Sequence, residues 1–242
     1  MFSHSHTRTV GAAAVAALAI LTIGSSNVHT ADSRAKMRAE AAEQSAKAAK
    51  AFEAVMQVPD KAIPRDLLAR ARAIAVFPNV LKVAFTVGGE GGRGVVSRRR
   101  EDGWSSPIFF RAGGPSFGAQ VGVSSTDLFF LIMNDESLES LMKDRVELGG
   151  DVGVAAGPVG RNAGAGTDAL MHAAMLSYSR SRGLFAGVNV KGIVLKPEDE
   201  LNLAVYGKTA EELVKEPIDG SATTESDLSA FPRALSRHTS QP

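Results

Sequence analysis

Three consecutive arginines, Arg98 to Arg100, form the densest cluster of potential ligand-binding side chains in the sequence. Guanidinium groups bind phosphate and carboxylate groups through paired hydrogen bonds. In an alternating strand Arg98 and Arg100 share one face, and Arg99 points to the other. The sequence Glu101-Asp102-Gly103 then predicts a turn. The three cations are therefore either a binding surface or the charged end of a hairpin that prevents edge-to-edge association.

The preceding glycine-rich stretch "GGEGGRG", residues 88–94, lacks the flanks of a nucleotide site. A Walker-type loop needs Gly-Lys-Ser/Thr at the start of a helix, and a dinucleotide loop passes from a strand into a helix. Here β-prone residues stand on both sides, Val83 to Val87 before and Val95 to Ser97 after. We therefore place these glycines within or between strands, in a bulged or tightly turning hairpin, and expect no nucleotide.

Residues that could support catalysis or bind a metal are sparse. The chain has no cysteine, and His172 is the only histidine in the expected domain. Ser177 or Ser179 could combine with His172 and Asp168, but no nucleophile elbow surrounds either serine. Asp151 and Asp168 stand among glycines, where aspartate commonly forms turns, and no zinc-ligand spacing is present. We expect no enzymatic activity, cofactor or metal, and a hydrolase is only the third hypothesis.

The N-terminus predicts export. Arg8 precedes the apolar stretch "GAAAVAALAILTI" and then small polar residues, which is the pattern of a signal peptide over residues 1–31. The apolar core is short for a bilayer span, so a retained anchor is the weaker alternative. Without cysteine there is no lipidated N-terminal cysteine. We expect a periplasmic or secreted protein that associates peripherally with a membrane.

Charge is distributed unevenly over the mature chain. Residues 32–100 carry 14 basic and 7 acidic side chains, a net charge of +7, whereas residues 101–242 carry 12 basic and 19 acidic ones, a net charge of −7. A basic N-terminal third can attract anionic lipid or polymer. Alternatively, the two parts pack together and neutralise each other. The aromatic residues lie in apolar runs without interleaved basic residues, so nucleic acid is not an expected partner.

Two helices should precede the strands. Alanines recur at helical spacing from Asp32 to about Val58, and this long helix carries Lys47 and Lys50. Its apolar stripe is mostly methyl groups, which favours docking on the domain over insertion into a membrane. A short basic helix starts at Pro64 and includes Arg65.

After Ala73 the pattern changes to alternation and apolar runs broken by glycine, which predicts strands. We expect strands near residues 74–77, 82–87, 93–99, 106–111, 117–123, 127–133, 146–155, 175–179, 184–195 and 201–206. Short helices should cover "NDESLESLMKD", capped by Asn134 or Asp135, and "TAEELVKE", capped by Thr209. The fold class is then α+β, with a long N-terminal helix and short helices packed on a curved, mainly antiparallel, glycine-rich sheet. The domain spans 32–216, and a polar tail over 217–242 should be disordered.

Several separated blocks also resemble a known family. The runs "AIAVFPNVLKVAF", "VGGEGGRGVV", "GGPSFGAQVGVSSTDLFFLIMN", "VAAGPVGRNAGAGTD" and "LSYSRSRGLFAGV" are similar to the SYLF domain over about Ala62 to Gly207. The family occurs in exported bacterial proteins and in eukaryotic membrane-trafficking and actin-patch proteins. Gly164 and Lys191 stand where the resemblance leads us to expect glutamates, which puts a metal-dependent role for those positions in doubt.

The resemblance implies lipid binding, because eukaryotic SYLF domains bind phosphoinositides with help from an N-terminal amphipathic helix. Some yeast members bind actin. For this chain we expect non-catalytic binding of anionic phospholipid at the bacterial envelope. The alternative is a structural or protein-interaction module that contacts an envelope protein. The candidate lipid-binding residues are Lys47, Lys50, Arg65, Arg98, Arg99 and Arg100.

Overall fold

The computed structural model describes residues 13–58, 62–84, 88–116, 122–160, 173–181, 183–219 and 228–239. The helices are α1 (Ala13–Met56), α2 (Arg65–Arg70), α3 (Asp135–Lys143), α5 (Asp199–Tyr206), α6 (Ala210–Lys215) and α7 (Ala230–Thr239). The strands are β1 (Ala73–Ala84), β2 (Gly88–Arg100), β3 (Gly103–Trp104), β4 (Ile108–Ser116), β5 (Gly122–Ile132), β6 (Val146–Glu147), β7 (Val154–Ala156), β8 (Met175–Ser181), β9 (Leu184–Gly187) and β10 (Val194–Pro197). The expected α+β class is confirmed.

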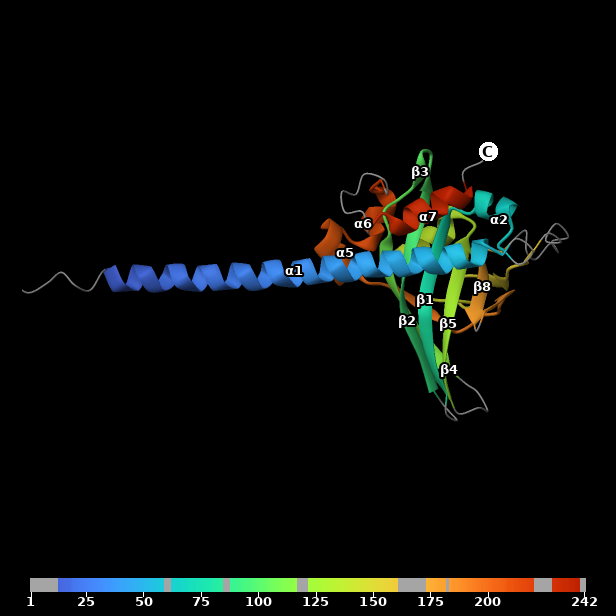
Figure 1. Cartoon of the computed structure of the whole chain (residues 1–242), viewed down its shortest axis with the longest axis horizontal. Coiled ribbons are helices and arrows are strands. Elements are labelled where there is room, and N and C mark those ends of the chain that lie inside the picture. Colours follow the sequence, from blue (N-terminus) through green and yellow to red (C-terminus); the bar gives the residue numbers. More distant parts are fainter. Residues whose placement is uncertain are drawn as a thin grey trace, which may run out of the picture.

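The strands form one curved sheet in the order β6-β10-β4-β2-β1-β5-β8-β7, with β3 paired to β2 and β9 paired to β8 (Figure 1). Every pairing among the described strands is antiparallel except β7 with β8. The long strands β1, β2, β4 and β5 occupy the middle of the sheet. They therefore fix the positions of the residues at their ends.

Helices cover both faces of this sheet. Ile74 and Val76 of β1 contact a core shared with α1, α2, α5 and α7, whereas Ala75 and Phe77 contact a second core shared with α3 and α6. Adjacent strand residues point to opposite faces, so a strand buried on both sides needs a continuous apolar run. This is the reason for the run "AIAVF" at residues 73–77.

Helix α1 docks on the domain through its C-terminal half, as the small size of its apolar stripe indicated. The buried residues of this half recur at helical spacing and include Ala41, Ser45, Ala48, Phe52 and Val55. Figure 1 shows the N-terminal half of α1 extending well beyond the sheet. The helix begins before the expected start at Asp32, and the expected signal peptide and its cleavage remain predictions. No helix among the described residues is both long enough and apolar enough to cross a bilayer.

The glycine-rich stretch lies inside strand β2, beside an irregularity in β1. The register of β1 shifts between Val76 and Leu81 against β2, and Asn79 adopts a left-handed backbone conformation with φ of 54°. A Cβ atom on Gly94 would lie 2.5 Å from the carbonyl oxygen of Val76. The glycines were therefore correctly assigned to the sheet, but the bulge belongs to β1, and Gly94 permits its close approach.

Two expectations about the C-terminal part of the chain were wrong. Residues 201–206, read as a strand, form most of α5, because Leu201, Asn202 and Val205 are buried at helical spacing and Gly207 ends the helix in a left-handed conformation. Part of the supposedly disordered tail forms α7. Its Phe231 is fully buried and packs edge to face on Phe52 of α1, with ring centroids 6.4 Å apart.

Several strand boundaries also differ. The segments 74–77 and 82–87 belong largely to the single strand β1, while 146–155 contains only the short strands β6 and β7. The segment 184–195 divides into β9 and the start of β10, separated by a turn at Lys191 and Gly192. Much of the expected strand 117–123 lies outside the described residues.

Candidate functional site

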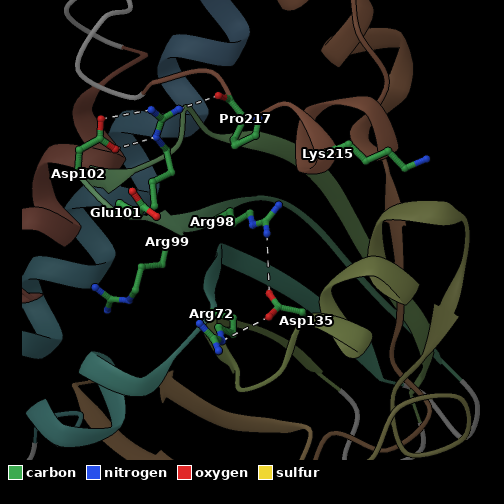
Figure 2. Close-up of a pocket in the computed structure, with 9 residues that line it drawn as sticks. Arg72, Arg98, Arg99, Glu101, Asp102, Asp135, Lys215 and Pro217 are labelled. Carbon is green, nitrogen blue, oxygen red and sulfur yellow. Dashed lines mark hydrogen bonds and ion pairs between the residues drawn. The ribbon is translucent and has the colours of Figure 1, made fainter.

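A cationic depression of about 830 Å³ lies where the end of β2 meets the start of α3 and the end of α6 (Figure 2). We call it the β2 depression. The residues that line it are Arg72, Arg98, Arg99, Arg100, Glu101, Asp102, Asp135, Lys215 and Pro217. Five are cations and three are acids, so the lining carries a formal charge of +2. The sequence run of three arginines is therefore part of a concave site.

The three arginines alternate as a strand requires. Arg98 Nη1 donates to the carbonyl oxygen of Val214, and Arg100 Nη1 donates to that of Pro217, so both reach toward the C-terminal end of α6. Arg99 reaches instead toward α2, where it donates to the carbonyl oxygens of Leu68 and Ala71 at 2.6 and 3.0 Å. The prediction that Arg98 and Arg100 share one face is confirmed.

The contacts of Arg99 stabilise the fold. Its guanidinium satisfies carbonyl groups at the end of α2 and lies 4.3 Å from the ring centroid of Trp104, in a cation–π contact. Burial, followed by repulsion from Arg72, lowers the pKa of Arg99 from its usual value. A residue with these contacts is poorly placed to bind a ligand as well.

Arg100 is also strongly engaged. Its Nε and Nη2 atoms donate to the two carboxylate oxygens of Asp102 at 3.0 and 3.3 Å, across the turn between β2 and β3. The hydrogen bond that Arg100 donates to Asp102 is the main reason that the pKa of Arg100 is raised. This pairing fits the alternative interpretation of the arginine run as a charged hairpin end.

The contacts of Arg72 and Arg98 with an acid are looser than those of Arg100. Asp135 lies between them, with one carboxylate oxygen 3.5 Å from Arg72 Nε and the other 3.9 Å from Arg98 Nη2 (Figure 2). Charge-assisted hydrogen bonds are usually about 2.7–2.9 Å long. The Arg72 and Arg98 side chains are 57% and 32% exposed, so both are accessible from solvent.

The local backbone fixes the positions of these three residues. The Arg72 amide donates to Ile132 at 2.8 Å, and its carbonyl accepts from the Arg99 amide at 2.7 Å. Asp135 opens α3 directly after the cap Asn134, whose side chain accepts from the amide of Ser137. The sheet and the helix cap therefore hold two cations and one acid around a common point.

The other three candidate cations lie elsewhere. Lys47, Lys50 and Arg65 are exposed and do not line the β2 depression. Lys47 pairs along α1 with Glu43 at 2.7 Å, a solvated helical ion pair of the kind that contributes little to stability. The structure thus separates the six proposed residues into three that line the β2 depression and three exposed cations on α1 and α2.

A second ionic cluster fixes α1 on the sheet. The nearly buried carboxylate of Glu198 accepts from Arg93 Nε at 3.0 Å and from Arg111 Nη2 at 2.7 Å. Arg93 also donates to Glu40 of α1. Burial by itself raises the pKa of Glu198, but the hydrogen bonds from the two arginines outweigh this effect and lower it.

These contacts cross the boundary between the basic and acidic parts of the sequence. Arg93 pairs with Glu198, and both Arg72 and Arg98 pair with Asp135. Part of the charge asymmetry is therefore neutralised inside the fold, as the packing alternative stated. The depression keeps a net positive charge because its five cations outnumber its three acids.

Of the candidate catalytic residues, only Ser177 and Ser179 lie in the part of the chain that the structure describes. Ser177 is buried, and its hydroxyl lies within hydrogen-bond distance of the carbonyl oxygens of Ala155 and Val188. Asp151 accepts from the amide of Glu147 and so forms a turn. His172, Asp168 and Gly164 lie outside the described residues. Within the described ranges, no cluster of three acidic or histidine side chains could hold a metal ion.

The motif "LSYSRSRGLFAGV" contributes to packing. Tyr178 is fully buried and stacks on Phe185, with ring centroids 5.4 Å apart. A Cβ atom on Gly157 would lie 2.0 Å from the Tyr178 ring, so glycine is required there. The Tyr178 hydroxyl has no hydrogen-bond partner among the described residues, and burial raises its pKa.

The fold and this site define a class of protein: an α+β domain with a helix-covered, curved sheet and a cationic depression at one end of a central strand. Residues 113–235 match the family model Ysc84, described as Las17-binding protein actin regulator. The chain belongs to this family, whose domain is the SYLF domain.

Individual relatives share a similar stretch. LAS seventeen-binding protein 3 and Protein YSC84, both from Saccharomyces cerevisiae, are 39% and 40% identical to this chain over 152 residues. SH3 domain-containing YSC84-like protein 1 from Homo sapiens is 37% identical over 150 residues. Each alignment covers 61% of this chain but only 33%, 32% and 44% of the respective relative. The chain therefore matches less than half of the length of these proteins.

Sequence reasoning missed three residues of the β2 depression: Arg72, Asp135 and Lys215. They lie far apart in the chain and meet only through the fold. Asp135 was identified as a possible helix cap, and this was the only local signal of its position. No sequence spacing could have paired it with Arg72 and Arg98.

Proposed function

We propose that this protein binds anionic phospholipid without catalysis, and that the β2 depression receives the headgroup phosphate. The observation that carries this proposal is the concave lining of five cations and three acids, in which Arg72 and Arg98 are solvent-accessible. Phosphate is a strong acceptor for guanidinium groups, and a concave surface with an excess of positive charge raises the local concentration of an anionic ligand. Family membership supports a binding role.

The location that we propose is the cell envelope, reached by export. The apolar segment after Arg8 supports this, because its length and flanks are those of a signal peptide. Peripheral association would then depend on charge at the domain surface. Binding should be sensitive to salt, since ions screen exposed charges over about 10 Å at 0.1 M.

Vesicle flotation tests this function. The protein should float with vesicles of phosphatidylglycerol and remain in solution with vesicles of phosphatidylcholine, and the bound fraction should fall as salt rises from 50 to 500 mM, since about 1 kcal/mol per cation near the surface is screened. Equal flotation with both lipids, or none with either, would refute binding of anionic lipid.

A protein-interaction role is the second candidate, and the names of the relatives favour it. The matched family is described as a Las17-binding protein and actin regulator, and one yeast relative is named LAS seventeen-binding protein 3. This chain could use the same domain surface for an envelope protein of its own. If the protein floats with neither kind of vesicle, the result favours this second candidate.

A further inference from the structure

Asp135 lies between two arginines of the β2 depression. Its two carboxylate oxygens face two different arginines, Arg72 at 3.5 Å and Arg98 at 3.9 Å. These are the two longest ion pairs among the described residues; for comparison, Arg180 and Asp127 lie 2.6 Å apart. The carboxylate of Asp135 thus contacts neither arginine as closely as the carboxylate of Glu198 contacts Arg93 and Arg111, at 3.0 and 2.7 Å.

A phosphate group can make closer contacts at this point. It offers more acceptor oxygens than a carboxylate, and as part of a ligand it is not tied to the start of α3. Arg98 is already oriented, because its Nη1 atom donates to Val214 and leaves Nη2 directed toward Asp135. Arg72 is held by its backbone between β5 and β2. A bound phosphate would therefore displace the Asp135 carboxylate and leave Arg72 and Arg98 largely in place.

The remaining arginines of the lining are less available, and the Lys215 side chain points away from Arg72 and Arg98 in Figure 2. Lys215 pairs with Glu211 at 2.8 Å, and Arg100 pairs with Asp102 through both carboxylate oxygens. Arg99 is bound to the end of α2. The two loosely paired arginines around Asp135 are thus the part of the depression with the most binding capacity left.

We infer that Arg72 and Arg98 form a phosphate subsite in which Asp135 acts as a built-in competitor that weakens ligand binding. This inference rests on the proposed function and deepens it. The ligand chemistry is a phosphate group, supplied either by a lipid headgroup or by a soluble phosphate. Wild-type affinity is then lower than the two arginines alone would give, and removal of the acid should increase it.

The test compares Asp135→Asn with Glu136→Gln. Both residues are exposed acids in the first turn of α3, so both variants remove one charge from the same helix end, but Glu136 does not line the depression. Asp135→Asn should bind phosphatidylglycerol vesicles about five-fold more tightly, the effect of one charge close to a membrane surface. Glu136→Gln should change affinity by less than about two-fold.

A combined variant locates the effect. In an Arg72→Gln/Arg98→Gln background, Asp135→Asn should give no increase, because the subsite that it unblocks has been removed. Equal increases for Asp135→Asn and Glu136→Gln, or a full increase in the background without the two arginines, would overturn the inference. Melting temperatures identify any variant that has lost the fold. Asp135→Asn by itself is a single conservative change, so its comparison with wild type does not depend on the folding of the combined variants.

A soluble probe separates the two ligand sources. Inorganic phosphate is titrated into wild type and Asp135→Asn while amide signals near Arg98 are followed by NMR. Tighter phosphate binding by Asp135→Asn without vesicle binding by either protein would support the subsite and refute the membrane function. Wild-type vesicle binding with no gain for Asp135→Asn toward either probe would overturn the subsite alone.

Discussion

Replacing Gly94 by alanine should lower the free energy of unfolding by about 3 kcal/mol, near the upper end of the usual cost of overpacking a core. The added methyl group would lie 2.5 Å from the Val76 carbonyl oxygen and 2.5 Å from Phe77 Cδ1. Phe77 is fully buried and packs edge to face on Phe130, so it cannot move aside freely. Urea unfolding followed by tryptophan fluorescence measures the change.

Gly91 provides the matched control in the same strand. A methyl group there would meet only the carbonyl oxygen of Ala112, at 3.6 Å, which is an ordinary contact. Gly91→Ala should therefore be neutral or stabilising by up to about 1 kcal/mol, because glycine is unfavourable in a strand interior. Equal effects of the two substitutions would contradict the close approach of β1 to Gly94.

Replacing Glu198 by glutamine should cost about 2 kcal/mol, because a nearly buried carboxylate that accepts charge-assisted hydrogen bonds from Arg93 and Arg111 loses its charge, while Arg93 keeps Glu40 as a partner. Arg93 links Glu198 to Glu40, so the docked half of α1 should loosen as well. Hydrogen exchange of the amides around Phe52 should become faster. Arg111→Ala, at a side chain that is 62% exposed, should cost less than about 1 kcal/mol and serves as the control.

The contribution of Glu198 should depend on pH with a definite sign. Hydrogen bonds from the arginines hold its pKa in the folded protein below the unfolded value of about 4.3. The stabilisation is therefore complete at neutral pH and is lost as pH falls through the lower, folded pKa. The stability difference between wild type and Glu198→Gln should be constant from about pH 6 to 8 and shrink below about pH 4. A difference that grows with acidity would contradict the ion-pair account.

The elements with strong local patterns could be predicted from the sequence. Alanine spacing identified the docked half of α1, and apolar runs identified the central strands. The alternation of Arg98, Arg99 and Arg100 also followed from strand geometry. Each of these depends on neighbours within a few residues, which is the range that periodicity covers.

The errors occurred where tertiary contacts decide the structure. The segment "LNLAVY" has short apolar alternation compatible with a strand, yet Asn202 is fully buried and bonds the backbone of Phe109, which requires a helix over β4. The polar segment at 230–239 forms α7 because Phe231 and Leu235 find a cover on α1 and α2. Composition alone cannot supply such a partner.

The candidate site shows the same limit. The arginine run marked one side of the β2 depression, whereas Arg72 and Asp135 joined it from distant parts of the chain. Family resemblance contributed the expectation of lipid, and the structure contributed the distinction between tightly held Arg99 and accessible Arg72 and Arg98. The two kinds of information were complementary.

The central claim is tested most directly by vesicle affinity of two charge-matched variants. Arg72→Gln/Arg98→Gln and Lys47→Gln/Lys50→Gln each remove two positive charges, one pair from the β2 depression and the other from the outer surface of α1. Affinity for phosphatidylglycerol vesicles is measured at low salt, with melting temperature as the check on folding. The account predicts that the first variant binds about 30-fold more weakly, at about 1 kcal/mol per cation, and that the second stays within about three-fold of wild type. Equal losses, or a larger loss from the α1 variant while both remain folded, would contradict headgroup binding in the depression.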